Sequence, residues 1–176
     1  YSRYGVQDFL VITYTPRGDL LSESSLSTVR ALKEALSVLE GVESVTTILD
    51  VPLLESPPKP IRELIKNVPN LESPGVDRAM ARTELVTSPI YRNLLVSPDF
   101  KTTTIQVNLS KDEKYRELLS RRDALRDEKH AGPWSPEKEQ QLRESAAEFK
   151  DYRGTVRERQ HRLIKEVRGV ITQYRG

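Results

Sequence analysis

The residue types that most often do chemistry are sparse in this chain of 176 residues. Cysteine is absent, and the two histidines, His130 and His161, have no cluster of metal ligands beside them. No Gly-x-Ser-x-Gly elbow is present, and "PRGD" has a single glycine, unlike a phosphate-binding loop. The carboxylate pairs at 112–113 and 127–128 have lysine or arginine nearby, which is typical of a solvated helix. We therefore expect a protein that is not an enzyme and that holds no metal or cofactor.

A different kind of chemistry, binding through an aromatic side chain, is suggested by Trp134. This residue is the single tryptophan, and it follows Pro133 between two stretches with a helical pattern. It can fold back over the turn, or it can stay exposed with Pro133 and contact a protein partner or a lipid surface. Both interpretations remain open, and Trp134 and Pro133 are the candidate partner-contact residues.

Charge is distributed unevenly along the chain. Residues 1–110 carry 11 Lys and Arg against 13 Asp and Glu, whereas residues 111–176 carry 17 against 13. A nucleic-acid surface in the basic segment 150–175 would need interleaved aromatics, and this segment offers Tyr152 and Tyr174 alone. Because the same segment has a strong apolar stripe, its basic side chains are interpreted as the exposed face of a helix, and no nucleic-acid partner is expected.

The composition is that of a folded, water-compatible piece of protein. Charged residues make up 31% of the chain, and the mean hydropathy is −0.57. No apolar run approaches the roughly 20 residues of a membrane-spanning helix. The first residues also lack the basic and apolar regions of a signal peptide.

The elements that must position these residues begin as strand, helix and strand. Residues 8–15, "DFLVITYT", are rich in β-branched and aromatic residues, which predicts a strand with two apolar faces. A helix follows, with Ser22 as its N-cap and Gly41 at its C-terminal cap. Residues 42–50 predict the second strand.

Residues 51–98 form a proline-rich insert, since they hold eight of the eleven prolines. Short helices are predicted at 61–68 and 76–85, each bounded by proline or glycine. We expect the insert to be ordered because it contains a set of apolar anchor residues, namely Ile61, Leu64, Ile65, Met80, Leu85, Ile90 and Tyr91.

Residues 93–110, "NLLVSPDFKTTTIQVNLS", predict a β-hairpin with a Pro-Asp turn. Its second strand covers residues 102–109, where Ile105, Val107 and Leu109 share one face.

Two helices follow the hairpin, at about 112–130 and 136–173. Between them, Gly132 is placed to end the first helix, Ser135 to cap the second, and Pro136 to occupy its first position. The second helix has apolar residues at seven-residue spacing: Leu142, Phe149, Val156, Leu163 and Val170. Because the apolar stripe thickens after Gly154, we expect a helical hairpin up to that residue and a sheet-covering helix beyond it.

Without the insert and the hairpin, the order of elements is βαββα, which lacks one strand of a ferredoxin-like βαββαβ unit. We therefore predict an α+β fold in a single domain, 1–176. Its parts are strand-helix-strand at 1–50, the insert at 51–98, the third strand at 99–110, the helical hairpin at 111–154 and the last helix at 155–176. Since the chain opens at Tyr1 without a methionine, we expect a domain excised from a larger protein. The first strand then has a bare edge, through which the chain can self-associate.

Two segments resemble a known family. Residues 4–54, "YGVQDFLVITYTPRGDLLSESSLSTVRALKEALSVLEGVESVTTILDVPLL", and residues 88–110, "SPIYRNLLVSPDFKTTTIQVNLS", are similar to the first periplasmic domain of resistance-nodulation-division (RND) exporters, specifically the MMPL-like predicted exporters. In that family pattern the residue after the Pro-Asp turn is usually glycine, whereas this chain has Phe100. The hairpin at 111–154 is an elaboration that the family pattern does not require.

The resemblance implies a porter-type domain on the periplasmic side of the bacterial inner membrane. Such a domain belongs to a proton-driven transporter, and it guides or gates a hydrophobic or lipid-like substrate. Its expected partners are the membrane helices and the second periplasmic domain of the same transporter, together with an accessory protein at the hairpin tip. The alternative is a non-enzymatic interaction module that presents a helical hairpin to a protein partner. A nucleic-acid binder is a third hypothesis, and it rests on the basic helix alone.

Overall fold

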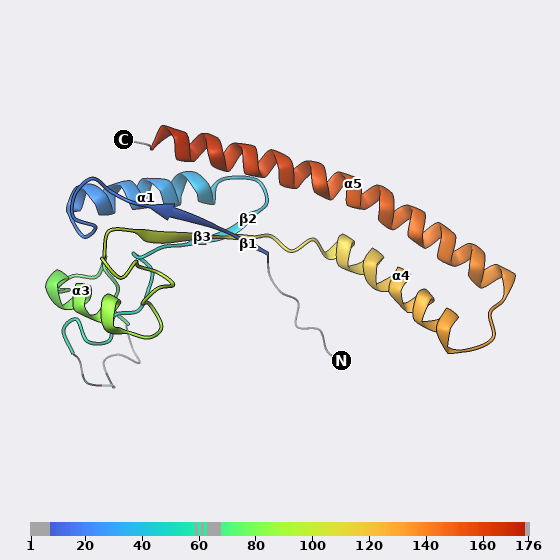
Figure 1. The fold of residues 1–176 in the computed structure, drawn as a ribbon, viewed down its shortest axis with the longest axis horizontal. Coiled ribbons are helices and arrows are strands. Elements are labelled where there is room, and N and C mark those ends of the chain that lie inside the picture. The colour runs from blue at the N-terminus through green and yellow to red at the C-terminus, as the bar shows by residue number, and fades with distance from the viewer. Residues whose placement is uncertain (1–7, 59, 61, 63–67, 175–176) are drawn as a thin grey trace. The chain divides into compact units, whose positions relative to one another are not determined.

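The computed structural model describes residues 8–58, 60, 62 and 68–174 and has an α+β fold. Its strands are β1 (Phe9–Tyr14), β2 (Val42–Thr46) and β3 (Thr103–Leu109). Its helices are α1 (Glu23–Ser37), α3 (Arg78–Thr87), α4 (Glu113–Ala131) and α5 (Pro136–Gln173) (Figure 1). The chain divides into two compact units. The sheet unit consists of residues up to 110 together with those from 167, and the hairpin unit consists of residues 111–166.

The three strands form one antiparallel sheet in the order β1-β3-β2, which agrees with the predicted α+β fold. Ile105 and Val107 of β3 are fully buried. They lie directly opposite Ile12 and Leu10 of β1. Because opposed residues of an antiparallel pair share a face, these four side chains mark the core side of the sheet.

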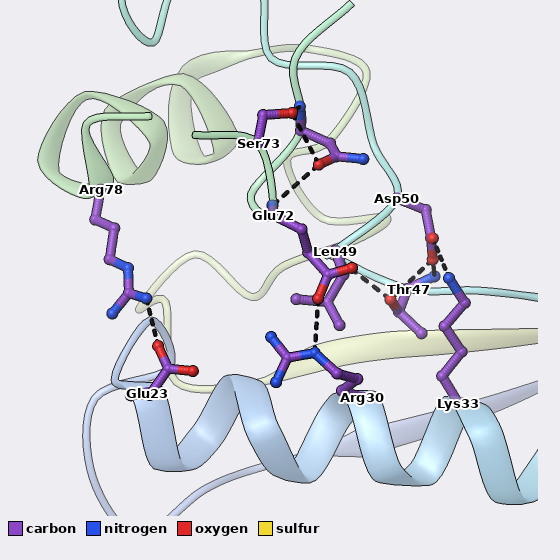
Figure 2. A network of polar contacts seen from close by, with 10 residues as sticks. Glu23, Arg30, Lys33, Thr47, Leu49, Asp50, Glu72, Ser73 and Arg78 are labelled. Carbon is purple, nitrogen blue, oxygen red and sulfur yellow. Dashed lines mark hydrogen bonds and ion pairs between the residues drawn. The ribbon is translucent and has the colours of Figure 1, made fainter. Parts of the chain in front are cut away.

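β2 ends at Thr46, earlier than the predicted strand 42–50. The cause is Asp50, whose Oδ2 accepts hydrogen bonds from the backbone N–H of Thr47 at 2.8 Å and from its hydroxyl at 2.9 Å. A nearby carboxylate that captures a backbone donor in this way competes with the sheet and turns the chain. Lys33 of α1 pairs with the other carboxylate oxygen of Asp50 (Figure 2).

α1 begins as predicted, because the Ser22 hydroxyl accepts a hydrogen bond from the backbone N–H of Ser25 at 3.3 Å. Its apolar stripe is buried at Leu26, Val29, Leu32 and Leu36. The prediction of Gly41 as the C-terminal cap was wrong, since the helix ends at Ser37 with Val38 as its cap. Gly41 adopts a φ of 90°, where glycine is favoured, and leads the chain into β2 instead.

The described part of the proline-rich insert is ordered and contributes to the core. Leu53, Leu71, Ala81 and Leu85 are buried in the same cluster as Leu26 and Val29 of α1. The helix predicted at 76–85 is α3, whose N-cap Asp77 accepts hydrogen bonds from the backbone N–H groups of Ala79 and Met80. The helix predicted at 61–68, with its anchors Ile61, Leu64 and Ile65, lies almost wholly outside the described residues.

Two of the predicted anchors of the insert are wrong. Met80 is 37% exposed and Ile90 is 68% exposed, so neither holds the insert to the core. Polar contacts supplement the apolar ones: Arg30 of α1 pairs with Glu72 at 2.7 Å, and Glu23 pairs with Arg78 at 2.6 Å (Figure 2). These pairs join the first helix to both ends of the segment 72–78.

The predicted hairpin that includes β3 has one regular strand rather than two. In the apolar run before the Pro-Asp turn, Val96 bridges to Arg92 and, across the turn, to Thr103. The turn closes through Ser97, whose N–H donates to the carbonyl of Thr102 at 2.9 Å. Phe100 is 5% exposed and adopts a φ of 55°, a left-handed conformation that is uncommon for residues other than glycine.

The hairpin unit has the predicted helix ends. Asp112 caps α4, and the Ser135 hydroxyl accepts a hydrogen bond from the N–H of Lys138 at the start of α5. Leu118 of α4 and Phe149 of α5 are buried, and the Tyr115 ring packs at a tilt against Phe149 with 5.3 Å between ring centroids.

α5 is continuous from Pro136 to Gln173, as predicted, and it runs through Gly154, where we expected its packing role to change from the hairpin to the sheet. The boundary between the two units lies later, before Val167. Glycine lacks a Cβ but can continue a helix at a modest cost, so the helix does not end there.

Candidate functional site

The tip of the hairpin unit is the loop between α4 and α5, and it carries both predicted contact residues. Pro133 is exposed and Trp134 is half-buried. The indole N–H of Trp134 donates a hydrogen bond to Oε2 of Glu139 in the first turns of α5, at 2.7 Å. Trp134 therefore folds back over the turn, as in the first of the two interpretations, and one part of its ring stays accessible.

Charged side chains surround the Trp134 ring. The ammonium groups of Lys129 and Lys138 lie 5.8 and 5.9 Å from the ring centroid, within the range of a cation–π contact. Lys129 also pairs with Glu139 at 2.7 Å, and Lys138 pairs with Glu128 at 2.7 Å. The hydrogen bonds from Lys129 and from Trp134 lower the pKa of Glu139, because both donors favour the ionised carboxylate.

At the other end of the hairpin unit, Asp112 organises a second polar cluster. It caps α4 by accepting from the N–H of Tyr115 at 2.9 Å, and both its carboxylate oxygens lie 3.0 Å from the Tyr152 hydroxyl. Arg159 approaches Asp112 at 3.4 Å, and its guanidinium lies 5.5 Å from the Tyr152 ring. Tyr152 thus serves the packing of the hairpin rather than standing free to stack on a base.

A hollow in the sheet unit was not found by sequence reasoning. It measures about 380 Å³ and is open to solvent, and its walls are formed by Val86, Thr87, Arg92, Asn93 and Pro98. Two large apolar side chains flank Arg92 and Asn93 in the chain: Ile90 is 68% exposed and Leu94 is 71% exposed.

Local hydrogen bonds hold the turn that presents these side chains. The N–H groups of Tyr91 and Arg92 donate to the carbonyl of Ser88, and the Tyr91 hydroxyl donates to the carbonyl of Pro52 at 2.7 Å. Burial raises the pKa of Tyr91, so its hydroxyl stays protonated and keeps donating. Asn93 adopts a φ of 64°, a conformation that asparagine tolerates better than most residues.

Comparison with known protein families, with curated proteins and with solved structures found no match. The surfaces that can be assigned a role are therefore those defined by the geometry of this chain. They are the hairpin tip around Trp134 and the apolar turn around the hollow, and both have the chemistry of non-covalent binding.

The two histidines lie on different helices of the described structure. His130 on α4 and His161 on α5 are both exposed. Within residues 8–58, 60, 62 and 68–174, no group of three or more His, Asp and Glu side chains has the arrangement of a metal site. In the same residues, no helix has the length and apolarity needed to cross a membrane.

Glu84 is a buried carboxylate that the sequence pattern did not single out. It is 8% exposed and accepts three hydrogen bonds: from the N–H groups of Leu54 and Glu55 at 2.7 and 3.0 Å, and from the Ser56 hydroxyl at 2.7 Å. These bonds attach the start of the insert to α3, the helix that leads into the hollow. Glu84 therefore helps to position the surface around the hollow.

Proposed function

We propose that this chain is an extracytoplasmic, porter-type domain of an RND-superfamily exporter of the MMPL-like kind, on the periplasmic side of the bacterial inner membrane. In this role it guides or gates a hydrophobic, lipid-like substrate, and the proton-driven step belongs to the membrane helices of the transporter. One observation carries the proposal. Most of the exposed apolar turn and hollow comes from residues 88–110, a segment whose sequence resembles that exporter domain.

The arrangement of the sheet unit supports this role. Apart from α3 and α4, the described elements follow the order β1, α1, β2, β3 and α5, with β3 between β1 and β2. This order supports a ferredoxin-like βαββα(β) unit whose last strand is not among the described residues. The two resembling segments contribute all three described strands. Because a fold of this kind hosts many functions, the proposal depends on the surface of residues 86–98 and not on the fold alone.

The chemistry of the hollow suits an amphiphile. Val86 and Pro98 provide apolar walls, and exposed Ile90 and Leu94 extend the apolar surface beside them in the chain. Arg92 forms no ion pair with any residue in the described part of the chain. An amphiphile would fit this surface with its acyl chain against the apolar side chains and its anionic head group near Arg92.

Binding of fluorescent probes tests this surface. We would titrate the chain with a pyrene-labelled fatty acid and compare the double variant Ile90→Ser/Leu94→Ser. Its affinity should fall by about tenfold, because two apolar contacts of about 0.8 kcal/mol or more are lost. Val38→Ser is the matched control, since Val38 is 83% exposed at the end of α1 and should leave binding unchanged.

A second comparison separates the contribution of the ligand's anionic head group to affinity from that of its acyl chain. Arg92→Gln should weaken binding of the fatty acid more than binding of uncharged N-phenyl-1-naphthylamine. If the wild-type chain shows no saturable binding, or if the Val38 variant loses as much affinity as the double variant, the surface is not a substrate contact.

The proposal that this chain belongs to an exporter can be tested separately, from the sequence that flanks it in the parent gene. Apolar runs of about 20 residues shortly before and after the 176 residues would support it, because an extracytoplasmic loop must connect membrane helices. A parent gene without such runs would contradict the proposal, whatever the probes bind.

A second candidate function, a protein-interaction module, is favoured by the separate compactness of residues 111–166. A unit with its own contacts can present a tip to a partner, and that tip holds Trp134 and exposed Pro133. Capture of a partner by the wild-type chain, lost in Trp134→Ala and retained in Ile90→Ser/Leu94→Ser, would favour this candidate over the exporter domain.

A further inference from the structure

β1 is an edge strand of the described sheet. Its single pairing partner there is β3, through a register that runs from Phe9 opposite Asn108 to Tyr14 opposite Thr103. Its other edge carries backbone N–H and C=O groups with no strand beside them in the described residues. Such an edge is a template for one more strand.

Burial along β1 is incomplete on both faces of the sheet. All six residues of the strand are exposed or half-buried, whereas Ile105 and Val107 of neighbouring β3 are fully buried. Phe9 is 52% exposed and Val11 is 56% exposed on the face opposite the core. A strand added beside β1 would cover side chains on both faces at once, which a partner docking on one face cannot do.

The register also shows where on the open face the apolar side chains lie. Phe9 and Val11 share that face with Asn108 and Gln106 of β3. The amide of Gln106 donates to Asn108 at 2.7 Å, and Asn108 donates to the Ser44 hydroxyl of β2 at 2.9 Å. The centre of the open face is therefore polar, and its apolar part is confined to the β1 edge.

The β1 edge lacks the usual protection against pairing. Residues 9–14, "FLVITY", contain no charged residue and no proline, the features with which edge strands commonly avoid association. Charge does not oppose self-pairing either. An antiparallel partner would place Asp8 of one copy beside Tyr14 of the other, away from the second Asp8.

We propose that two copies of this chain associate through their β1 strands, which pair antiparallel with Val11 opposite Val11 of the second copy. A two-fold axis at Val11 keeps the core faces of the two sheets continuous, because opposed residues then have the same orientation in both copies. Leu10 meets Ile12 on the core side, and Phe9 meets Thr13 on the open side. A register centred on Ile12 would leave Phe9 unpaired.

The expected dimer is weak and depends on concentration, because pairing of one short strand buries less surface than a stable interface requires. Sedimentation equilibrium of the chain should show a mean mass that rises from that of a monomer toward that of a dimer. Val11→Lys should remain monomeric, since a lysine on an edge strand opposes pairing. Val38→Lys is the matched control, because Val38 is 83% exposed and caps α1 rather than lying in β1, and it should associate like the wild type. Far-UV circular dichroism checks that both variants are folded.

Cross-linking tests the register directly because the chain has no cysteine of its own. Opposed residues of an antiparallel pair have Cα atoms about 4.5–5.5 Å apart, within the range of a disulfide. Val11→Cys should therefore form a covalent dimer under mild oxidation at least tenfold faster than Val38→Cys. Gln106→Cys, at the centre of the open face, should react as slowly as Val38→Cys.

Three outcomes would overturn the inference. Faster cross-linking at Gln106→Cys than at Val11→Cys would mean that the open faces pack on each other. A wild-type chain that stays monomeric at high concentration would mean that the edge is unused or is covered by another part of the same chain. Association that Val11→Lys leaves unchanged would place the interface elsewhere. None of these results bears on fatty-acid binding near Arg92, so the proposed exporter role is tested separately.

Discussion

The guanidinium of Arg82 lies 4.6 Å from the centroid of the Phe100 ring. Arg82 comes from α3, and Phe100 from the turn before β3, so the contact joins the insert to the sheet. Phe100 is buried to 5% exposure while its backbone adopts a φ of 55°. The residue thus combines an unfavourable backbone conformation with a favourable side-chain environment.

Phe100→Gly should destabilise the sheet unit by about 1–4 kcal/mol in chemical denaturation. Glycine relieves a left-handed conformation that costs about 1–2 kcal/mol for other residues, but loss of a buried phenylalanine costs about 3–5 kcal/mol. Asn93→Gly is the control, because Asn93 also has a positive φ of 64° but is exposed. It should change stability by no more than about 0.5 kcal/mol. A stabilised Phe100→Gly variant would mean that backbone strain outweighs packing at this turn.

Local signals explain why many element boundaries could be predicted. Ser22, Asp112 and Ser135 cap helices because their side chains reach N–H groups two or three residues ahead, a contact that sequence spacing alone determines. The antiparallel sheet follows from alternation and element order. In contrast, the apolar stripe that thickens after Gly154 suggested that the hairpin ends there, whereas the hairpin unit extends to Glu166.

Long-range packing explains what could not be predicted. Glu84 accepts from residues 54–56, and no local pattern connects the two positions. Ile90 was expected as an anchor but is exposed, because Leu53 and Leu71 reach the core from elsewhere in the insert. The hollow beside Arg92 depends on how that turn sits on α3, so the candidate substrate surface came from the structure. Trp134, by comparison, was identified by its type and its place between two helices.

Glu84→Gln should lower the free energy of unfolding by about 1–3 kcal/mol. The carboxylate accepts three hydrogen bonds, whereas a glutamine amide has one oxygen and would turn donor hydrogens toward other donors in a buried place. Glu72→Gln is the matched control, since Glu72 and its partner Arg30 are each 41% exposed. That change should cost no more than about 1 kcal/mol. Equal losses in the two variants, measured by urea denaturation, would contradict a positioning role for Glu84.

Asp112→Ala should destabilise the hairpin unit by about 1–3 kcal/mol, since it removes the cap of α4 and leaves the half-buried Tyr152 hydroxyl without its acceptor. Tyr152→Phe removes the second contact alone and should cost about 0.5–1.5 kcal/mol. The double variant should lose less than the sum of the two, because both share one hydrogen bond. Strictly additive losses, followed through the fluorescence of Trp134, would show that the hydroxyl and the carboxylate are not coupled.

The hairpin tip should report pH through Trp134, the single tryptophan. Hydrogen bonds from Lys129 and from the indole lower the pKa of Glu139 below its ordinary value of 4.5. Because this pKa is lower in the folded chain than in the unfolded one, the contribution of Glu139 to stability is complete above about pH 4.5 and is lost as the pH falls through the lowered value. Tryptophan fluorescence should therefore change with a midpoint below 4.5, before or without loss of far-UV circular dichroism. Glu139→Gln should abolish the step, while Glu137→Gln should keep it, since the lowered pKa of Glu137 derives from Ser135. A midpoint at or above 4.5, or a step that survives Glu139→Gln, would mean that Glu139 does not hold the indole in solution.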